Sequence, residues 1–550
     1  MDQKTAARGV ASEAASAVRG LDCLFFFGWT GTLLLLIGGM AAAFFIFGFW
    51  WPYWRTADMD VWMVANAFFL NSGLPQETFD HPSYLSFLAL AEWFRLLHKI
   101  GLLDVYDLSG LPAAADVAGF ERAYTAAVRA GRVLSLGLAI AFVVAVAFLL
   151  RRLVDDWRVA ALGAFALAWS GGVTIHARMM RSELISAELL IVALLIILIA
   201  ARSPRMIWRP LLLGTSATLA TLALTNKVQS ILHIVLLPLI ALPFGANSDD
   251  PKGFWRNART ALPAAAVYAT AASVLLIVAA PLIWFGLTAV DQSIFKYTPV
   301  AFGMFGVYQP IIVAWIALGI ATFAIAWRVP AAETVSTLLA VIGGAALGLS
   351  FLYLRYHPQD VLEVGNPLEH LFAAATASHQ DLAETPGILS GSLLAKLAAG
   401  IGAMLARRTF VLAPSPRPTI VLEWLVIAGI VVAVRGGQHK LAMQAAVLMA
   451  AAWAIDTVGI LRGLANAYMI LTDPLVIIAG ALLLAGLKGL QQTRWTFGVG
   501  AGLMTLHVVL SMAEPVKHTF RTDKPTELCE PLQATIPQIG PFPFCTTPGL

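Results

Sequence analysis

Long apolar stretches recur along the whole of this 550-residue chain and constrain its fold more than any other feature. Stretches of about 18 to 25 residues match the length of a helix that crosses roughly 30 Å of hydrocarbon with its backbone groups paired internally. Only 12% of the residues are charged and 59% are hydrophobic, whereas soluble domains carry about 25% charged residues. The sequence therefore predicts an all-α, polytopic helical membrane protein.

The apolar runs, read against the charged breaks between them, predict about 13 transmembrane helices. The first run is too long for the apolar region of a signal peptide and lacks a small-residue cleavage site, so we expect it to be retained as the first span. Residues 1–22 then form an N-terminal segment, and residues 23–512 form the transmembrane domain. The expected spans lie near residues 23–50, 131–150, 159–177, 184–201, 210–225, 229–245, 260–285, 308–327, 334–354, 418–434, 441–460, 471–487 and 495–512.

The Arg and Lys residues between the spans predict an orientation. If the N-terminus is cytoplasmic, the breaks on its side are short and basic, Arg151 and Arg152 among them, as the positive-inside rule expects. Two long segments, 51–130 and 355–417, then lie on the other side of the membrane. An odd number of spans places the C-terminal tail, residues 513–550, on that side as well.

The tail contains two of the three cysteines, Cys529 and Cys545. Cysteines outside the cytoplasm commonly pair, because those compartments are oxidising. The predicted orientation places the tail in such a compartment, so we expect a disulfide between Cys529 and Cys545.

Several classes of function are disfavoured by the sequence. The formal net charge is only +4, and the basic residues form no tract that could follow a nucleic acid backbone. The chain also lacks a nucleotide-binding GxxxxGK[ST] motif and a dinucleotide-binding GxGxxG in strand context. The cytoplasmic breaks are too short for a catalytic domain, so we expect any chemistry at the outer face, without direct use of ATP.

Polar residues concentrate directly after the first span. Asp58 and Asp60 lie two positions apart, and His81 and Tyr84 follow in the same loop. Such carboxylates can act as a general base toward an acceptor hydroxyl, or can contribute ligands to a divalent metal. An Asp at a membrane boundary is also commonly solvated without a further role, so the motif by itself is a weak signal.

This arrangement resembles the layout of the GT-C superfamily of polyprenyl-phosphate-sugar-dependent glycosyltransferases. The shared features are an apolar first span, an acidic pair at its outer end and a loop of about 80 residues, in a chain of about 13 spans. The layout is similar to that of the aminoarabinose and protein O-mannosyl transferases and of the catalytic oligosaccharyltransferase subunit. The run NSGLPQETFDHP, residues 71–82, is similar to a bacterial branch of membrane glycosyltransferases.

The resemblance implies a hexosyl- or pentosyltransferase in the inner membrane of a bacterium. It implies a polyprenyl-phosphate-linked sugar as donor and an envelope glycan or lipid as acceptor, with the reaction at the periplasmic face. It also implies that the first-loop carboxylate, Asp58 or Asp60, is the catalytic base, and that His81 and Tyr84 contact substrate. No cofactor is implied, and a divalent metal at Asp58 and Asp60 is the alternative left open.

Cations near the outer boundary are candidates for binding the donor phosphate, which carries negative charge as the sugar–oxygen bond breaks. Arg178, Arg181 and Lys227 lie in very short outer turns, against the positive-inside trend, and Arg462 ends another span. The alternative for each cation is that its long side chain extends from a span end to water and has no function. We expect Glu183 to contact substrate or to pair with one of these Arg residues.

The preferred function is an inverting glycosyltransferase with an Asp base. The alternative is a transporter or flippase for a lipid-linked saccharide, which would need charged residues along a path through the bilayer. In this sequence we expect the charged residues to collect at one boundary of the membrane, which favours the transferase over the flippase. Residues 388–406 are expected to form an amphipathic helix at the outer leaflet, ending at Arg407 and Arg408.

Overall fold

The secondary structure of the chain is entirely helical in the part that the structure describes, with no strand there. A computed structural model of the 550-residue chain defines these elements. It describes residues 28–57, 59–74, 83–202, 208–245, 315–316, 318–319, 323, 326–327, 329–351, 393–409, 417–461, 469–487, 494–522 and 524–546.

Seven of the described helices are long and apolar enough to cross a membrane. This confirms a multi-pass helical membrane protein. The expected number of about 13 spans stays a prediction, because the runs 260–285 and 308–327 lie wholly or largely outside the described residues. The seven helices are α2 (Gly28–Phe47), α5 (Val117–Val154), α8 (Ser182–Arg202), α14 (Ala331–Ser350), α19 (His439–Leu461), α20 (Met469–Gly486) and α21 (Arg494–Phe520).

The structure divides one of the expected spans into two helices. The run 159–177 is divided into α6 (Trp157–Ala168) and α7 (Gly171–His176). Ser170 starts α7 as its N-cap, with its hydroxyl accepting a hydrogen bond from the backbone nitrogen of Val173 at 3.3 Å. This cap satisfies a backbone donor at the new helix start. Other runs correspond to α9 (Trp208–Asn226), α10 (Ile231–Ala241) and α18 (Ile420–Arg435), and α17 (Leu393–Thr409) precedes α18.

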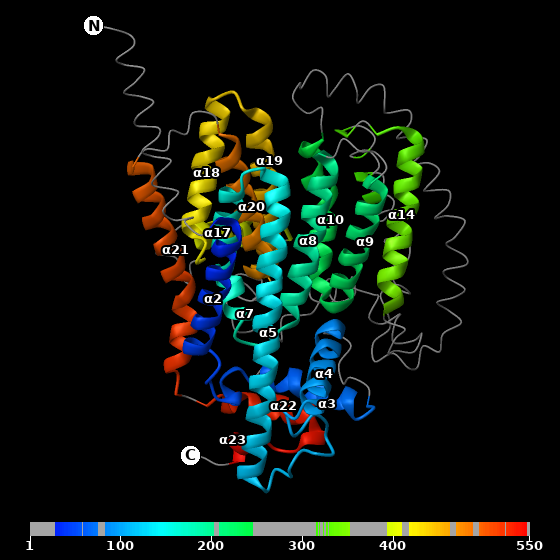
Figure 1. Cartoon of the computed structure of the whole chain (residues 1–550), viewed down its shortest axis with the longest axis vertical. Helices are drawn as coiled ribbons and strands as arrows, with labels where there is room; N and C mark the ends of the chain where they lie inside the picture. The colour runs from blue at the N-terminus through cyan, green and yellow to red at the C-terminus, as the bar shows by residue number, and fades with distance from the viewer. Residues whose placement is uncertain are drawn as a thin grey trace.

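A small helical lobe caps one end of the bundle (Figure 1). It contains η1 (Tyr53–Thr56), α3 (Asp60–Asn71), α4 (Tyr84–Lys99) and the first turns of α5. The C-terminal helices α22 (Cys529–Thr535) and α23 (Pro543–Thr546) complete it. We call this unit the lobe, and the adjoining end of the bundle the lobe end.

Aromatic rings from two distant parts of the sequence form the core of the lobe. Phe542 packs edge-on against Phe120 and Tyr124, and Phe544 packs against Tyr53, with ring centroids 5.5 to 5.9 Å apart. Such aromatic contacts add to the stabilisation that burial provides. The first loop and the C-terminal tail therefore share one hydrophobic core on the same side of the bundle, as the sequence predicted.

The tail also contains the disulfide that the sequence predicted. The sulfur atoms of Cys529 and Cys545 are joined, and both residues pack against the core of the lobe. The disulfide therefore closes the C-terminal segment onto itself beside the aromatic core.

Basic residues lie at the end of the bundle opposite the lobe. Helix α5 has 38 residues, or about 57 Å at 1.5 Å per residue, and it starts in the lobe, so Arg151 and Arg152 in its last turn lie at the far end (Figure 1). Arg202 ends α8 there and donates to the carbonyl of Leu153. Arg151, Arg152 and Arg202 thus lie together at one end of the bundle, in breaks that the sequence predicted to be short and basic. The side of the membrane that each end faces stays a prediction.

Candidate functional site

Residues 177–181, the turn between α7 and α8, make polar contacts with the lobe and with both helices. The backbone nitrogen of Met180 donates to Asp60 Oδ1 at 2.8 Å, and the guanidinium of Arg178 donates to the carbonyl of Thr174. Arg181 forms an ion pair with Glu183 at 3.2 Å. One short turn thus connects the first loop, α7 and the start of α8.

Asp60 is the centre of the contact between the lobe and this turn. Its Oδ2 lies 2.8 Å from both Nε and Nη2 of Arg132 and also accepts from the hydroxyl of Thr56. Its Oδ1 accepts from Met180. Arg132 also donates to the carbonyl of Trp51 at 2.6 Å, and the side chains of Asp60 and Arg132 are fully buried.

These contacts assign a structural role to Asp60. Both of its carboxylate oxygens accept hydrogen bonds, and an ion pair compensates its charge. A general base needs access to the hydroxyl that it deprotonates, and Asp60 lacks that access. Asp60 therefore does not fit the role of the base, and the assignment of Asp58 stays a prediction.

Three predicted site residues, Asp58, His81 and Arg462, lie outside the described residues. Their assignments stay predictions. Among the residues that the structure describes, no group of three or more His, Cys, Asp or Glu side chains could hold a metal ion. A metal at Asp58 and Asp60 is not tested by this finding, since Asp58 is outside that set.

Glu183 holds two of the predicted cations together. Its Oε1 lies 3.2 Å from Nη2 of Arg181 and 3.1 Å from Nζ of Lys227, and its side chain is 2% exposed. The predicted pairing of Glu183 with an Arg is therefore confirmed. We call these three residues the Glu183 cluster. It carries two positive charges and one negative charge, so it keeps an excess of positive charge at the lobe end.

His176 borders the Glu183 cluster, whereas Arg178, in the same turn as Arg181, does not. Burial, together with the nearby charge of Arg181, lowers the pKa of His176 to about 4, so the imidazole is neutral at pH 7. Burial also lowers the pKa of Arg178 to about 10, which leaves it cationic at neutral pH. Arg178 Nη2 lies 3.6 Å from the sulfur of Met512, so this cation contacts α21 rather than Glu183.

Asn226 fixes the start of α4 beside Lys227. Its Oδ1 accepts from the backbone nitrogen of Ser86 at 3.0 Å, and its Nδ2 donates to the carbonyl of Ser182 at 2.8 Å. Its own carbonyl accepts from the nitrogen of Ser83 at 3.0 Å. The first loop therefore returns to the bundle next to the Glu183 cluster.

Tyr84, predicted to contact substrate, is buried at this junction. Its hydroxyl donates to the carbonyl of Phe351 at 2.7 Å, directly after α14. The described contact is therefore one between α4 and the end of α14.

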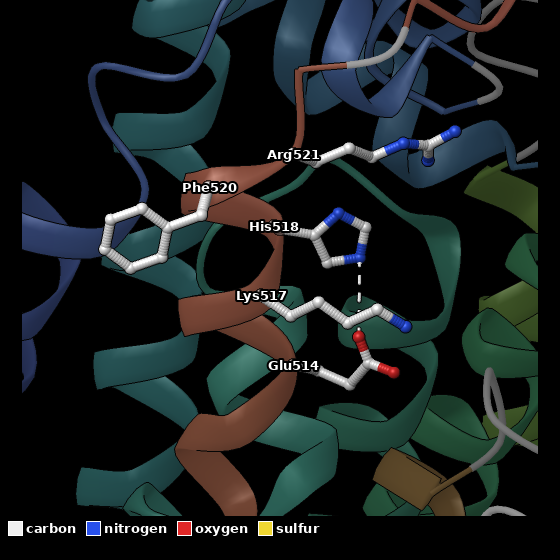
Figure 2. A pocket seen from close by; sticks show the side chains of 5 residues that line it. All are labelled: Glu514, Lys517, His518, Phe520 and Arg521. Atoms are coloured by element: carbon white, nitrogen blue, oxygen red, sulfur yellow. Dashed lines mark ion pairs between the residues drawn. The ribbon is translucent and has the colours of Figure 1, made fainter.

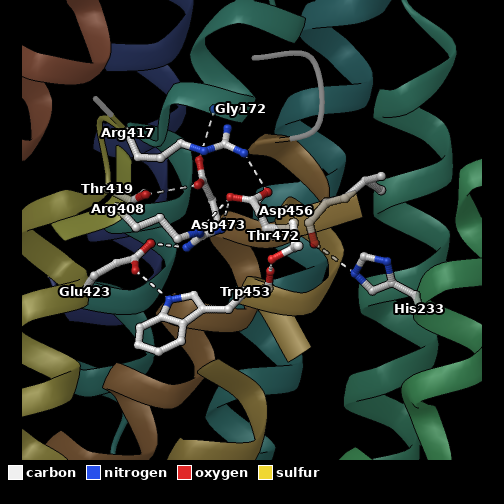
Figure 3. A network of polar contacts seen from close by, with 12 residues as sticks. Gly172, His233, Arg408, Arg417, Thr419, Glu423, Trp453, Asp456, Thr472 and Asp473 are labelled. Atoms are coloured by element: carbon white, nitrogen blue, oxygen red, sulfur yellow. Dashed lines mark hydrogen bonds and ion pairs between the residues drawn. The ribbon is translucent and has the colours of Figure 1, made fainter. Parts of the chain in front are cut away.

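A second ionic centre was not predicted (Figure 3). Arg408 forms ion pairs with Glu423 and, at 2.6 Å, with Asp456. Arg417 pairs with the other oxygen of Asp456 at 2.5 Å. Asp473 completes the group, and all five side chains are almost completely buried. We call these five residues the buried cluster.

Neutral donors hold Asp473 in the buried cluster. Its Oδ2 accepts from the backbone nitrogen of Gly172 at 3.1 Å, and its Oδ1 accepts from the hydroxyl of Thr419 at 3.2 Å. Gly172 is in α7, and its carbonyl lies 2.7 Å from Nδ1 of His176. Helix α7 therefore lies between the buried cluster and the Glu183 cluster.

The buried cluster lies near the same end of the bundle and corrects one expectation. Asp456 lies in α19 and Asp473 in α20, each about one turn from the end of a candidate membrane span. The helix expected at the outer leaflet packs against α19, and its Arg408 points into the bundle. The signal in the sequence was a carboxylate inside each of several apolar runs, which is costly in a membrane without a partner.

A pocket of about 440 Å³ lies at the lobe end of α21 (Figure 2). Glu514, Lys517, His518, Phe520 and Arg521 line it. We call it the terminal pocket.

No protein-family model, curated protein or solved structure matches the chain. Function is therefore inferred from the residues described above and from the resemblance in layout.

Proposed function

We propose that the protein is a GT-C type glycosyltransferase of a bacterial inner membrane, acting at its periplasmic face. In the proposed reaction it transfers a sugar from a polyprenyl phosphate to a hydroxyl of an envelope glycan or lipid. The observation that carries the proposal is the excess positive charge of the Glu183 cluster, at the end of an apolar bundle where the first loop docks. A lipid phosphate at a membrane surface needs such cations as the leaving-group charge develops.

The proposed chemistry is a single displacement. Asp58 accepts the proton of the acceptor hydroxyl while the oxygen forms a bond to the anomeric carbon. The bond from that carbon to the phosphate oxygen breaks, and its electron pair leaves with the polyprenyl phosphate. Arg181 and Lys227 are the proposed partners of the phosphate, with Arg178 and Arg462 as further candidates. A divalent metal at Asp58 and Asp60, the alternative that the sequence left open, would have to displace the contacts of Asp60 with Arg132 and Met180.

The flippase alternative is favoured by the buried cluster. Ionisable side chains inside membrane helices commonly mark substrate or proton pathways. Asp456 and Asp473 occupy such positions, and three carboxylates face two guanidiniums there. A saccharide-lipid transporter is therefore the second candidate function.

One assay separates the two candidates. The purified chain is reconstituted into liposomes with undecaprenyl phosphates that carry a radiolabelled hexose or pentose, together with an extract of envelope glycolipids. Release of free undecaprenyl phosphate and transbilayer movement of the label are measured together. A transferase releases the lipid phosphate and labels an acceptor, whereas a flippase moves the intact labelled lipid.

The outcomes decide the proposal. Acceptor labelling that depends on the protein supports the transferase. Movement of the label without bond cleavage contradicts it and supports the flippase. Absence of both activities across the donor panel contradicts both candidates for these donors.

A further inference from the structure

The terminal pocket concentrates positive charge at one spot of the surface. Lys517 and His518 of α21, and Arg521 directly after it, extend to the same side, whereas Phe520 points to the other side (Figure 2). The only acid that lines the pocket among the described residues is Glu514, whose Oε2 lies 3.8 Å from Nε2 of His518. The pocket therefore carries more positive than negative charge.

A further cation reaches this place from the first loop. Arg55 donates through Nη1 to the carbonyl of Thr519 at 2.9 Å, and its charge acts together with those of Lys517 and Arg521 on the ring of His518. Trp51 donates to the hydroxyl of Thr519 at 3.0 Å. The segment that contains η1, shortly before the predicted base Asp58, is thus hydrogen-bonded to the end of α21.

The pocket also lies at a membrane boundary. Helix α21 contains a candidate span that ends at Phe520. Phe520 is 74% exposed and Trp50 is 64% exposed. Trp and Tyr side chains near the ends of membrane helices, such as Trp50, are typical of the headgroup region. A ligand in the terminal pocket would therefore be at the depth of a lipid head group.

We infer that the terminal pocket binds the phosphate monoester head of a polyprenyl phosphate, the lipid product of the proposed transfer; this inference rests on the proposed function. The lining cations Lys517 and Arg521 exceed the lining acid Glu514 by one charge when ionised, and Arg55 adds a further cation beside the pocket. A phosphate monoester carries about −1.5 to −2 at pH 7 and has three strong acceptor oxygens. The sugar-loaded donor is a diester with a single negative charge, so the pocket favours the product over the donor.

One contact lies between the turn that carries Arg181 and the helix that carries the terminal pocket. Arg178 is three residues before Arg181 and contacts Met512, which is two residues before Glu514 on α21. The terminal pocket therefore lies on the helix that this turn contacts, where it can hold the product after transfer.

The test measures lipid binding to the purified full-length protein by native mass spectrometry. The probes are undecaprenyl phosphate, undecaprenyl-phosphoryl-hexose, phosphatidylcholine and inorganic phosphate. The variants are Lys517→Gln and Arg521→Gln. The matched control is Arg122→Gln, which removes an exposed cation of the lobe on α5.

The inference predicts a defined order of affinities. Undecaprenyl phosphate binds at least about fivefold more tightly than the diester, and each pocket variant binds it about tenfold or more weakly, as expected for the loss of a charge-assisted contact. Arg122→Gln binds like the wild type. In the transfer assay, the same pocket variants show weaker inhibition by added undecaprenyl phosphate with unchanged KM for the donor.

Several results would overturn the inference. Unchanged binding of undecaprenyl phosphate in both pocket variants would show that Lys517 and Arg521 are solvated and do not bind the phosphate. Equal affinity for the monoester and the diester would contradict the assignment of the pocket to the product. If inorganic phosphate alone binds with the same dependence on Lys517 and Arg521 and the lipid does not, the lipid assignment is wrong. If undecaprenyl phosphate binds as expected but no donor is cleaved, the phosphate site stands and the proposed transferase fails.

Discussion

Two buried ionic centres at the lobe end differ in how their charges balance. Asp60 and Arg132 form a pair of one anion and one cation, and the backbone and Thr56 satisfy the remaining polar atoms of Asp60. The buried cluster instead has three carboxylates for two guanidiniums, and Asp473 receives only neutral hydrogen bonds in the described structure. A buried pair with equal positive and negative charge holds the elements around it in one arrangement. A buried group with more carboxylates than guanidiniums can change its protonation state or its ion-pair partners. Position near a membrane boundary therefore does not by itself identify a catalytic carboxylate.

The largest expected effect is the loss of the balanced pair. Asp60→Asn leaves the buried charge of Arg132 without a counterion, which destabilises a protein by about 3–5 kcal/mol. We expect a large fall in the thermal unfolding temperature of the purified protein in detergent. Asp104→Asn is the control, because Asp104 is an exposed carboxylate of the same lobe. Equal unfolding temperatures of the two variants would show that the pair does not stabilise the fold.

The buried cluster offers an internal comparison. Asp456→Asn removes the carboxylate that pairs with both Arg408 and Arg417, so it should cost about 3 kcal/mol or more. Asp473→Asn should cost less than about 1 kcal/mol, because an amide can accept from Gly172 and donate to the Thr419 hydroxyl while excess negative charge is lost. Thermal unfolding of the two variants, measured side by side, tests this difference. Similar losses of stability in the two variants would mean that the buried cluster does not carry an excess of negative charge.

A smaller, pH-dependent effect is expected at His176, between the two clusters. Its folded pKa of about 4 lies below its ordinary value of 6.5, so the folded state binds fewer protons than the unfolded state. The contribution to stability is complete above pH 6.5 and is lost as the pH falls toward 4. His176→Asn, which can still donate to the Gly172 carbonyl, should remove about 1–3 kcal/mol of this pH dependence. Unfolding at pH 7 and pH 4.5 measures it, and identical pH dependence in both proteins would contradict the burial of a neutral imidazole.

The sequence predicted the helices better than the ionic centres. Apolar runs in α8, α14 and α19 match their helices closely, because length and hydrophobicity alone identify a membrane span. The division into α6 and α7 was missed, since the Ser170 cap is a local signal inside an apolar run. The disulfide was predicted, because two cysteines in one tail leave a single pairing there.

The partners of the charged residues could not be read from the sequence. Asp60 and Arg132 are 72 positions apart, and Gly172 and Asp473 are 301 apart. Which side chains meet depends on how the helices pack, and that packing follows from the whole set of apolar faces. The cations of the Glu183 cluster were found because they break the positive-inside trend, a rule that needs no packing information.

The direct test of the account is the pair Asp58→Asn and Asp60→Asn, each assayed for both unfolding temperature and transfer of a radiolabelled sugar from undecaprenyl phosphate. Asn preserves the size of the side chain and removes its charge. The account predicts that Asp58→Asn unfolds like the wild type and loses on the order of 100-fold or more in transfer rate, the scale of a general base. It predicts that Asp60→Asn is mainly a stability defect. Near-normal transfer by Asp58→Asn, or a folded and stable Asp60→Asn protein without activity, would contradict it.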